Sequence, residues 1–112
     1  MPDLAPIAPI LDRLPFPLDD VDAVNACYVR CVETAAPKAR RTVDMWTYAF
    51  AYRYFARKTT VGDLDGADLE QLVGTAYERV QRYRDTVRDP SAYGQWVSVV
   101  CRNAFLNYVR PR

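Results

Sequence analysis

The chain has 112 residues, half of them apolar, and a net charge of +1 at neutral pH. This length fits one domain with a small core. No apolar run approaches the roughly 18 residues that a membrane-spanning helix needs, and the N-terminus lacks the pattern of a secretory signal. An odd number of cysteines without such a signal favours a reducing, cytoplasmic location.

Residues 1–18 hold five of the eight prolines. Because proline fixes φ and lacks an amide proton, this segment is expected to be extended. Its interspersed Leu, Ile and Phe residues are too apolar for a simple linker. We therefore expect an N-terminal arm, 1–18, that packs on the domain formed by residues 19–112 or on a partner.

The remainder of the chain predicts about four helices and no strand. They cover roughly residues 20–35, 42–58, 67–84 and 90–109, and Tyr83 belongs to the apolar stripe expected to face the core on the third. Asp19 or Asp20 caps the first helix and Pro37 ends it. The second is apolar nearly all round, which predicts a central position in a bundle. The expected fold is all-α, a small helical bundle.

The ends of the fourth helix also carry signals. Asp89 and Pro90 read as an N-cap followed by proline in the first turn, and Pro111 stops the helix.

Charge is unevenly distributed along the chain. Residues 1–37 carry two basic and six acidic residues, whereas residues 38–112 carry 13 basic and eight acidic residues. Of the 15 basic residues, 13 are arginine, which suits contacts with phosphates and base edges. This asymmetry is typical of a nucleic-acid face with an acidic flank, although a basic stripe is often only a solvated surface.

No enzymatic constellation is found in the sequence. There is no histidine, no Gly-rich phosphate loop and no paired-cysteine metal motif. Cys27 and Cys31 lie four apart on a helix face, but without histidine they fit two small core residues better than half of a metal site. Cys101 completes the set of three. We expect no catalysis, cofactor or metal.

The fourth helix has two different faces. One arc, the expected core face, holds Tyr93, Val97, Val100, Cys101, Ala104, Phe105 and Tyr108. The other carries amides and arginines, with Trp96 at its border. Asn and Arg read base edges, and an aromatic ring stacks on an unpaired base. The simpler alternative is an amphipathic helix whose Trp closes the core.

Residues 68–110 resemble region 2 of bacterial sigma factors, especially the small extracytoplasmic-function type. The similarity rests on four motifs in the family's order and spacing over about 43 residues: Glu70-Gln71-Leu72-Val73, Tyr93-Gly94-Gln95-Trp96-Val97, Cys101-Arg102-Asn103 and Asn107-Tyr108-Val109-Arg110. The aromatic and basic segment 48–58 is similar to the first helix of that region.

The resemblance implies a promoter-melting module that binds the clamp helices of core RNA polymerase and captures the non-template strand of the −10 element. Polymerase is then expected at Glu70, Gln71 and Gly74. The expected DNA-binding residues are Arg88, Tyr93, Trp96, Arg102, Asn103, Asn107 and Arg110. Arg82 and Arg84 are expected beside Arg88 as phosphate contacts, on the basis of charge.

The chain departs from the family pattern at several positions. Gln71 replaces an acidic residue, and Gly74 and Thr75 replace a Gln and an acid, which weakens the expected clamp contact. Asn107 replaces an aspartate on the reading helix. Region 4 is absent, so we expect either a piece of a longer protein or a partner polypeptide that supplies region 4.

Three hypotheses remain open from the sequence. The first is the sigma-like module, and the second is a protein-interaction module on a sigma-like scaffold that binds a regulator instead of promoter DNA. The third is a helical bundle that binds no nucleic acid. Salt-dependent binding of single-stranded DNA separates the first from the others, since counterion release weakens such binding as salt rises.

Overall fold

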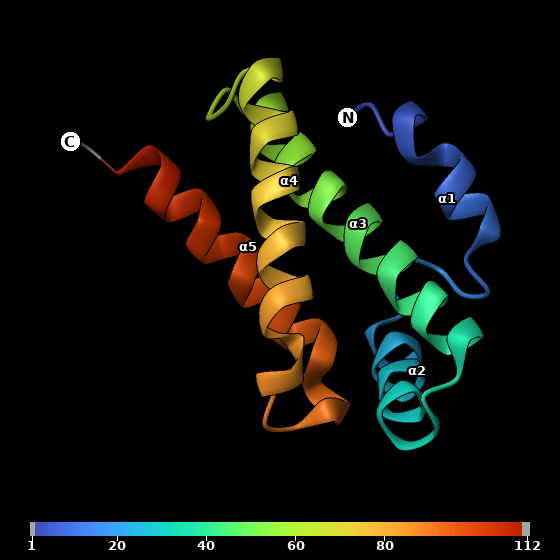
Figure 1. Cartoon of the computed structure of the whole chain (residues 1–112). Helices are drawn as coiled ribbons and strands as arrows, with labels where there is room; N and C mark the ends of the chain where they lie inside the picture. The colour runs from blue at the N-terminus through green and yellow to red at the C-terminus, as the bar shows by residue number, and fades with distance from the viewer. Residues whose placement is uncertain (1, 111–112) are drawn as a thin grey trace.

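The computed structural model describes residues 2–110, and within that range the chain forms helices and no strand. The all-α class and the small bundle are therefore confirmed. Five α-helices are joined by loops and three short 3-10 turns (Figure 1). In chain order they are η1 (Ala5–Ile7), α1 (Ala8–Arg13), α2 (Val21–Thr34), α3 (Pro37–Thr60), α4 (Gly66–Tyr83), η2 (Arg84–Thr86), η3 (Pro90–Ala92) and α5 (Tyr93–Val109).

Three of the helical elements, α2, α4 and η3, begin at an aspartate side chain that caps the first turn. Asp20 caps α2 by accepting a hydrogen bond from the backbone N–H of Ala23 at 3.0 Å. Asp65 and Asp68 form a reciprocal capping box at the start of α4. Asp89 accepts from the N–H of Ser91, but the turn it opens is η3, and α5 follows directly after it.

Residues 5–13 of the N-terminal segment are helical, so the prediction of an extended arm is wrong for this part, whereas the chain leaves the helix at Leu14 in an extended conformation. Pro6 and Pro9 occupy the first turns of η1 and α1, where the missing amide proton removes no intrahelical hydrogen bond. The arm packs on the domain as expected. Ile7 is 1% exposed and Leu18 is 8% exposed, and both belong to the same core as the later helices.

Helix α3 lies at the centre of the bundle, as its apolar sequence predicts. It contacts α1, α2, α4 and α5 (Figure 1). It is longer than expected because Pro37 opens it in the first turn. The preceding helix has already ended at Thr34, where Ala35 adopts a left-handed conformation with φ 53°.

The core lies where α2, α4 and α5 meet α3. Its largest fully buried side chains include Trp46, Phe55 and Tyr93. The indole N–H of Trp46 donates to the carbonyl oxygen of Leu18 at 3.0 Å, which anchors the end of the arm to α3.

Two aromatic residues expected on core faces are exposed. Tyr83 is 49% exposed at the end of α4, and Tyr108 is 40% exposed. The last turns of α5 extend beyond α4, so Tyr108 has little core to enter and instead donates a hydrogen bond to the carboxylate of Asp68 (Figure 1). That bond lowers the pKa of Asp68.

Candidate nucleic-acid interface

The start of α5 is fixed to α2 by a buried asparagine. The backbone N–H of Gly94 donates to Asn25 Oδ1 at 2.7 Å, and Asn25 Nδ2 donates to Gln95 Oε1 at 3.0 Å. A Cβ at position 94 would lie 2.8 Å from Val21 Cγ1, so only glycine allows this close approach. These contacts set the position of α5 and therefore of Trp96.

Trp96 is half-buried at the border between core and surface. One side of its indole packs on Tyr93, with ring centroids 6.1 Å apart. The other side lines two hollows, which we call the loop hollow and the central hollow. Part of the indole thus serves packing and part is available to a ligand.

The loop hollow has a volume of about 460 Å³ and brings Arg88 and Trp96 together with η3 and the start of α5. The central hollow, about 230 Å³, brings Trp96 and Asn103 together with α4. Two of the expected DNA-binding residues, Arg88 and Asn103, therefore each line a hollow with Trp96. A third depression, the outer hollow, holds Asn107 and measures about 570 Å³.

Arg102 and Arg110 do not share these hollows. Both are exposed, and Arg110 follows the last turn of α5. Burial raises the pKa of Tyr54 on α3, and the nearby charge of Arg102 opposes that rise. The arginine and asparagine residues expected on one reading face are thus not all gathered in the hollows.

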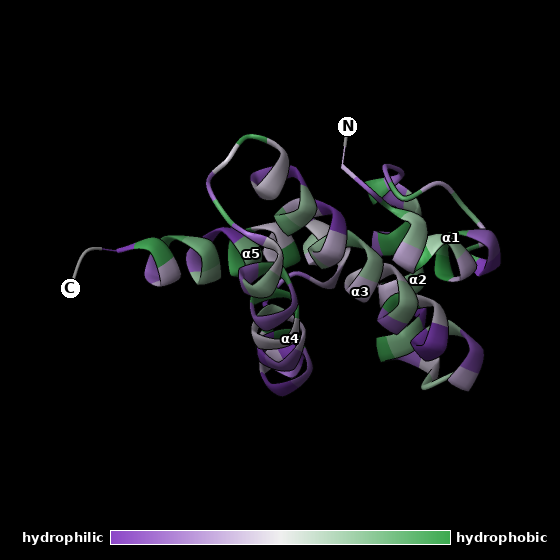
Figure 2. Ribbon diagram, turned by 90° about the horizontal axis from the view of Figure 1, so that it is seen from above, coloured by the Kyte–Doolittle hydropathy of each residue, from purple (hydrophilic) through white to green (hydrophobic). Residues whose placement is uncertain are grey.

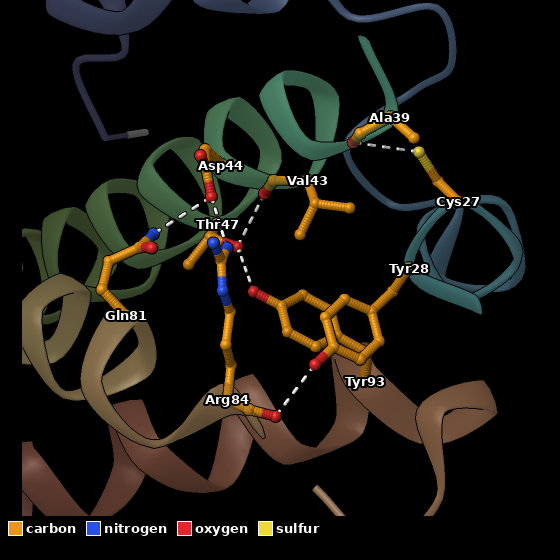
Figure 3. A network of polar contacts seen from close by, with 9 residues as sticks. All are labelled: Cys27, Tyr28, Ala39, Val43, Asp44, Thr47, Gln81, Arg84 and Tyr93. Carbon is orange, nitrogen blue, oxygen red and sulfur yellow. Dashed lines mark hydrogen bonds and ion pairs between the residues drawn. The ribbon is translucent and has the colours of Figure 1, made fainter. Parts of the chain in front are cut away.

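Tyr93, expected to contact DNA, is a core residue and is fully buried. Its ring stacks on Tyr28 with centroids 4.2 Å apart, and its hydroxyl is 2.7 Å from Thr47 Oγ1 (Figure 3). Burial raises its pKa far above the ordinary value of 10.0. Because the ring is fully buried, it offers no surface for the direct DNA contact that was expected of it. It supports Trp96 from the core side instead.

Arg84, expected to contact phosphate, is also buried. Its Nη1 lies 2.6 Å from Asp44 Oδ1, and its backbone carbonyl accepts a hydrogen bond from the hydroxyl of Tyr28 (Figure 3). Burial alone would lower the pKa of this guanidinium, but the hydrogen bond and charge of Asp44 outweigh it and raise the pKa. Arg84 therefore holds α3 and α4 together.

Arg82 is exposed and pairs with Glu78 one turn earlier at 2.6 Å. Its charge is partly compensated within α4, and Arg82 lines none of the hollows that hold Trp96, Asn103 or Asn107. The geometry therefore does not group Arg82 with the other residues expected to bind DNA.

The three residues expected to face polymerase lie on two sides of α4. Glu70 and Gly74 line a hollow of about 440 Å³ with Pro6 of the arm and with Tyr48 and Tyr52 of α3. Gln71 instead lines the outer hollow beside Asn107. The N-terminal arm thus forms part of the surface around Glu70 and Gly74.

None of the three cysteines is paired in a disulfide within the described residues, and Cys27 and Cys101 pack in or against the core. Cys27 and Cys31 are half-buried, and the thiol of Cys27 donates to the carbonyl oxygen of Ala39 at 3.5 Å. Within residues 2–110 no three His, Cys, Asp or Glu side chains form a group suited to a metal ion. In the same range, no helix combines the length and apolar composition needed to cross a bilayer.

The sequence-based prediction missed two residues that face Trp96 from α4. Arg79 and Tyr83 line the central hollow with Trp96 and Asn103. Their spacing of four residues on one helix was a usable signal. Tyr83 was instead assigned to the apolar stripe of its helix, and Arg79 is one of many arginines.

The arrangement suits binding of an unpaired nucleic-acid strand. It offers an indole edge, four side-chain amides and two arginines around shallow hollows. Its one acidic lining residue, Asp89, is engaged by the N–H and hydroxyl of Ser91. Amides read base edges and aromatic rings stack on bases. No family model, curated protein or solved structure matches this chain.

Proposed function

We propose that this protein is a transcription-initiation module of the sigma region 2 type. In this role it binds core RNA polymerase through α4 and captures the non-template strand of a promoter −10 element on α5. It performs no covalent chemistry. The stacking and hydrogen bonding of unpaired bases offset the cost of opening the duplex, which is a few kcal/mol per base.

The observation that carries this proposal is the position of Trp96. Its indole lies between two hollows on the open side of α5, with Arg88 in one and Asn103 in the other. An aromatic ring held half-buried by Tyr93 is presented rigidly, so little conformational entropy is lost when a base stacks on it.

The primary experiment is fluorescence anisotropy with a labelled non-template −10 oligonucleotide, with and without core polymerase, at two salt concentrations. Trp96→Ala is expected to lower affinity by at least about five-fold, the loss typical of one base–aromatic stack. Binding is expected to weaken as salt rises, because arginines displace counterions from phosphates.

Trp96→Phe is the matched variant, since it keeps an aromatic ring, and it should retain most of the affinity. Thermal unfolding of both variants completes the test. If Trp96→Ala abolishes cooperative unfolding, the indole is a core residue and the assignment of its function is wrong. If folded Trp96→Ala binds like the wild type, the proposed DNA site is also wrong.

Contact with polymerase is a separate part of the proposal, and it is supported by the exposed Glu70 and Gly74 beside a hollow. Gly74 lies in the interior of α4, where an added Cβ would meet no heavy atom within 4 Å, so nothing inside the chain requires glycine there. Glu70→Arg is expected to reduce pull-down by core polymerase while leaving oligonucleotide binding intact.

The alternative is a protein-interaction module on the same scaffold, and the outer face of α5 favours it. Val99, Leu106 and Val109 are 51%, 45% and 44% exposed along this helix. Hydrophobic residues are visible on the part of α5 that extends toward the C-terminus (Figure 2). Exposed apolar groups in one row are typical of a partner-binding face. In this case Leu106→Asp would abolish partner binding, whereas Trp96→Ala would not.

A further inference from the structure

We propose that a bound strand runs in a furrow between α4 and α5, and that Arg79 and Tyr83 of α4 form its second wall. This inference rests on the proposed function and assigns to α4 a direct role in holding the nucleic acid. The ligand class is a single-stranded nucleic acid. Arg79 contacts a backbone phosphate, and Tyr83 stacks on an unpaired base opposite Trp96.

The first argument is the continuity of the three hollows. Trp96 lines both the loop hollow and the central hollow, and Arg79 lines both the central hollow and the outer hollow. The three hollows are therefore neighbours in a row, and we take them as one furrow from Arg88 to Asn107. The walls of the central and outer hollows come from α4 and α5, which cross in contact with each other (Figure 1). The walls of the loop hollow come from residues 86–92 and α5.

The second argument is the state of the two α4 side chains. Arg79 is exposed and forms no ion pair within residues 2–110, in contrast to Arg82 and Arg84 of the same region. Tyr83 is 49% exposed, and within the described chain no other aromatic ring packs on it. An unpaired cation and an open aromatic face at one hollow are the two components of a single-strand site.

The third argument is that the backbone that carries both side chains is held in place, while the side chains themselves stay outside the core. Val80, which lies between them in sequence, is 1% exposed and anchors this part of α4. The hydroxyl of Thr86 donates to the carbonyl oxygen of Tyr83 at 2.6 Å, which fixes the end of the helix. The wall opposite Trp96 is therefore preformed.

The test compares four variants of the whole chain for binding to a fluorescein-labelled single strand of about 12 nucleotides, a typical site length. Arg79→Ala is matched by Arg82→Ala, which removes the same charge three residues away on the same helix but outside the furrow. Tyr83→Ala is matched by Tyr83→Phe, which keeps the ring. Each variant is also checked for cooperative thermal unfolding.

Arg79→Ala is expected to make the plot of log affinity against log salt shallower by about 0.7, the value of one phosphate contact on a single strand. Arg82→Ala should leave the slope unchanged. Tyr83→Ala should weaken binding at least about five-fold, and Tyr83→Phe should bind like the wild type. A strand carrying 4-thiothymidine should photo-crosslink to α4 as well as α5.

The inference is overturned if the wild type binds the strand and Trp96→Ala weakens binding, yet the variants in α4 have no specific effect. In that case Arg79→Ala and Arg82→Ala would have the same salt slope, and Tyr83→Ala would bind with the affinity of the wild type. In that outcome the proposed function stands and the strand lies on α5 alone. If the wild-type chain binds no strand with or without polymerase, the proposed function and the inference both fail.

Discussion

Arg84 and Asp44 join two helices through a buried ion pair, with Arg84 Nη1 at 2.6 Å from Asp44 Oδ1. The same carboxylate oxygen accepts a hydrogen bond from Gln81 Nε2 at 3.2 Å. The Arg84 side chain is 5% exposed, whereas the exposed pair Arg82–Glu78, at the same distance, has side chains 62% and 67% exposed. These two arginine–carboxylate pairs thus differ mainly in burial, with Asp44 itself 30% exposed.

Asp44→Ala is expected to lower the free energy of unfolding by about 3 kcal/mol or more, because it leaves the Arg84 guanidinium buried without its counter-charge. Glu78→Ala, which breaks the exposed pair, should cost no more than about 0.5 kcal/mol. Urea unfolding followed by circular dichroism measures both. Equal losses in the two variants would show that burial does not govern the Arg84–Asp44 pair.

Gly74 of α4 and Gly94 of α5 are expected to respond oppositely to alanine. Gly94→Ala places a methyl group 2.8 Å from Val21 Cγ1 and 3.3 Å from Asn25 Oδ1, in a tightly packed contact. Overpacking of this kind typically costs about 1–3 kcal/mol. At Gly74 a Cβ meets nothing within 4 Å, so alanine should stabilise α4 by up to about 1 kcal/mol.

Thermal unfolding midpoints of Gly94→Ala and Gly74→Ala test this pair of predictions. Gly74→Ala should also leave oligonucleotide binding unchanged, because Gly74 lines the hollow beside Glu70 and lies outside the furrow. A drop in the midpoint of Gly74→Ala would point to a backbone requirement at that position that the packing does not explain.

Local sequence signals predicted the helices of this protein well. Helical periodicity placed α2, α4 and α5 within a few residues, and Asp20 and Asp89 marked real caps. These signals depend on neighbours three or four residues apart, so one sequence is enough to read them. The prolines of the arm misled the prediction because proline also begins helices.

Long-range contacts account for the errors at the candidate site. Arg84 is separated by 40 residues from Asp44, and Tyr93 by 46 residues from Thr47. A helical wheel places Tyr93 on the core face, whereas the family resemblance places it in the melting segment, and only the packed structure decides between them. Trp96 lines one hollow with Arg88 and another with Asn103. The binding of DNA there stays a prediction.

Tyr93→Phe separates packing from DNA contact. It removes only the hydroxyl that is 2.7 Å from Thr47 Oγ1 in the core, so the free energy of unfolding should fall by about 1 kcal/mol. Since the ring is fully buried, affinity for a single strand should equal that of the wild type. Anisotropy and urea unfolding on one preparation give both values. A specific loss of affinity without loss of stability would restore Tyr93 as a DNA contact.

Cys101 should make the protein less stable at alkaline pH. The thiol is fully buried, and burial raises its pKa from the ordinary 9.0 to about 12. Between these values the unfolded chain loses the thiol proton while the folded chain keeps it, so the unfolded state binds fewer protons. The free energy of unfolding therefore falls as pH rises through this window, by up to about 1.4 kcal/mol per pH unit from this group.

Cys101→Ala isolates this contribution. The variant loses packing energy at every pH, but its stability should fall less steeply than that of the wild type between about pH 9 and pH 11, a range below the raised pKa of about 12. Tyr93, whose pKa burial also raises, contributes in the same direction in both proteins and cancels in the comparison. Urea unfolding at a series of pH values gives the two slopes. Parallel curves would mean that the Cys101 thiol ionises as readily in the folded chain as in the unfolded one, contrary to its burial.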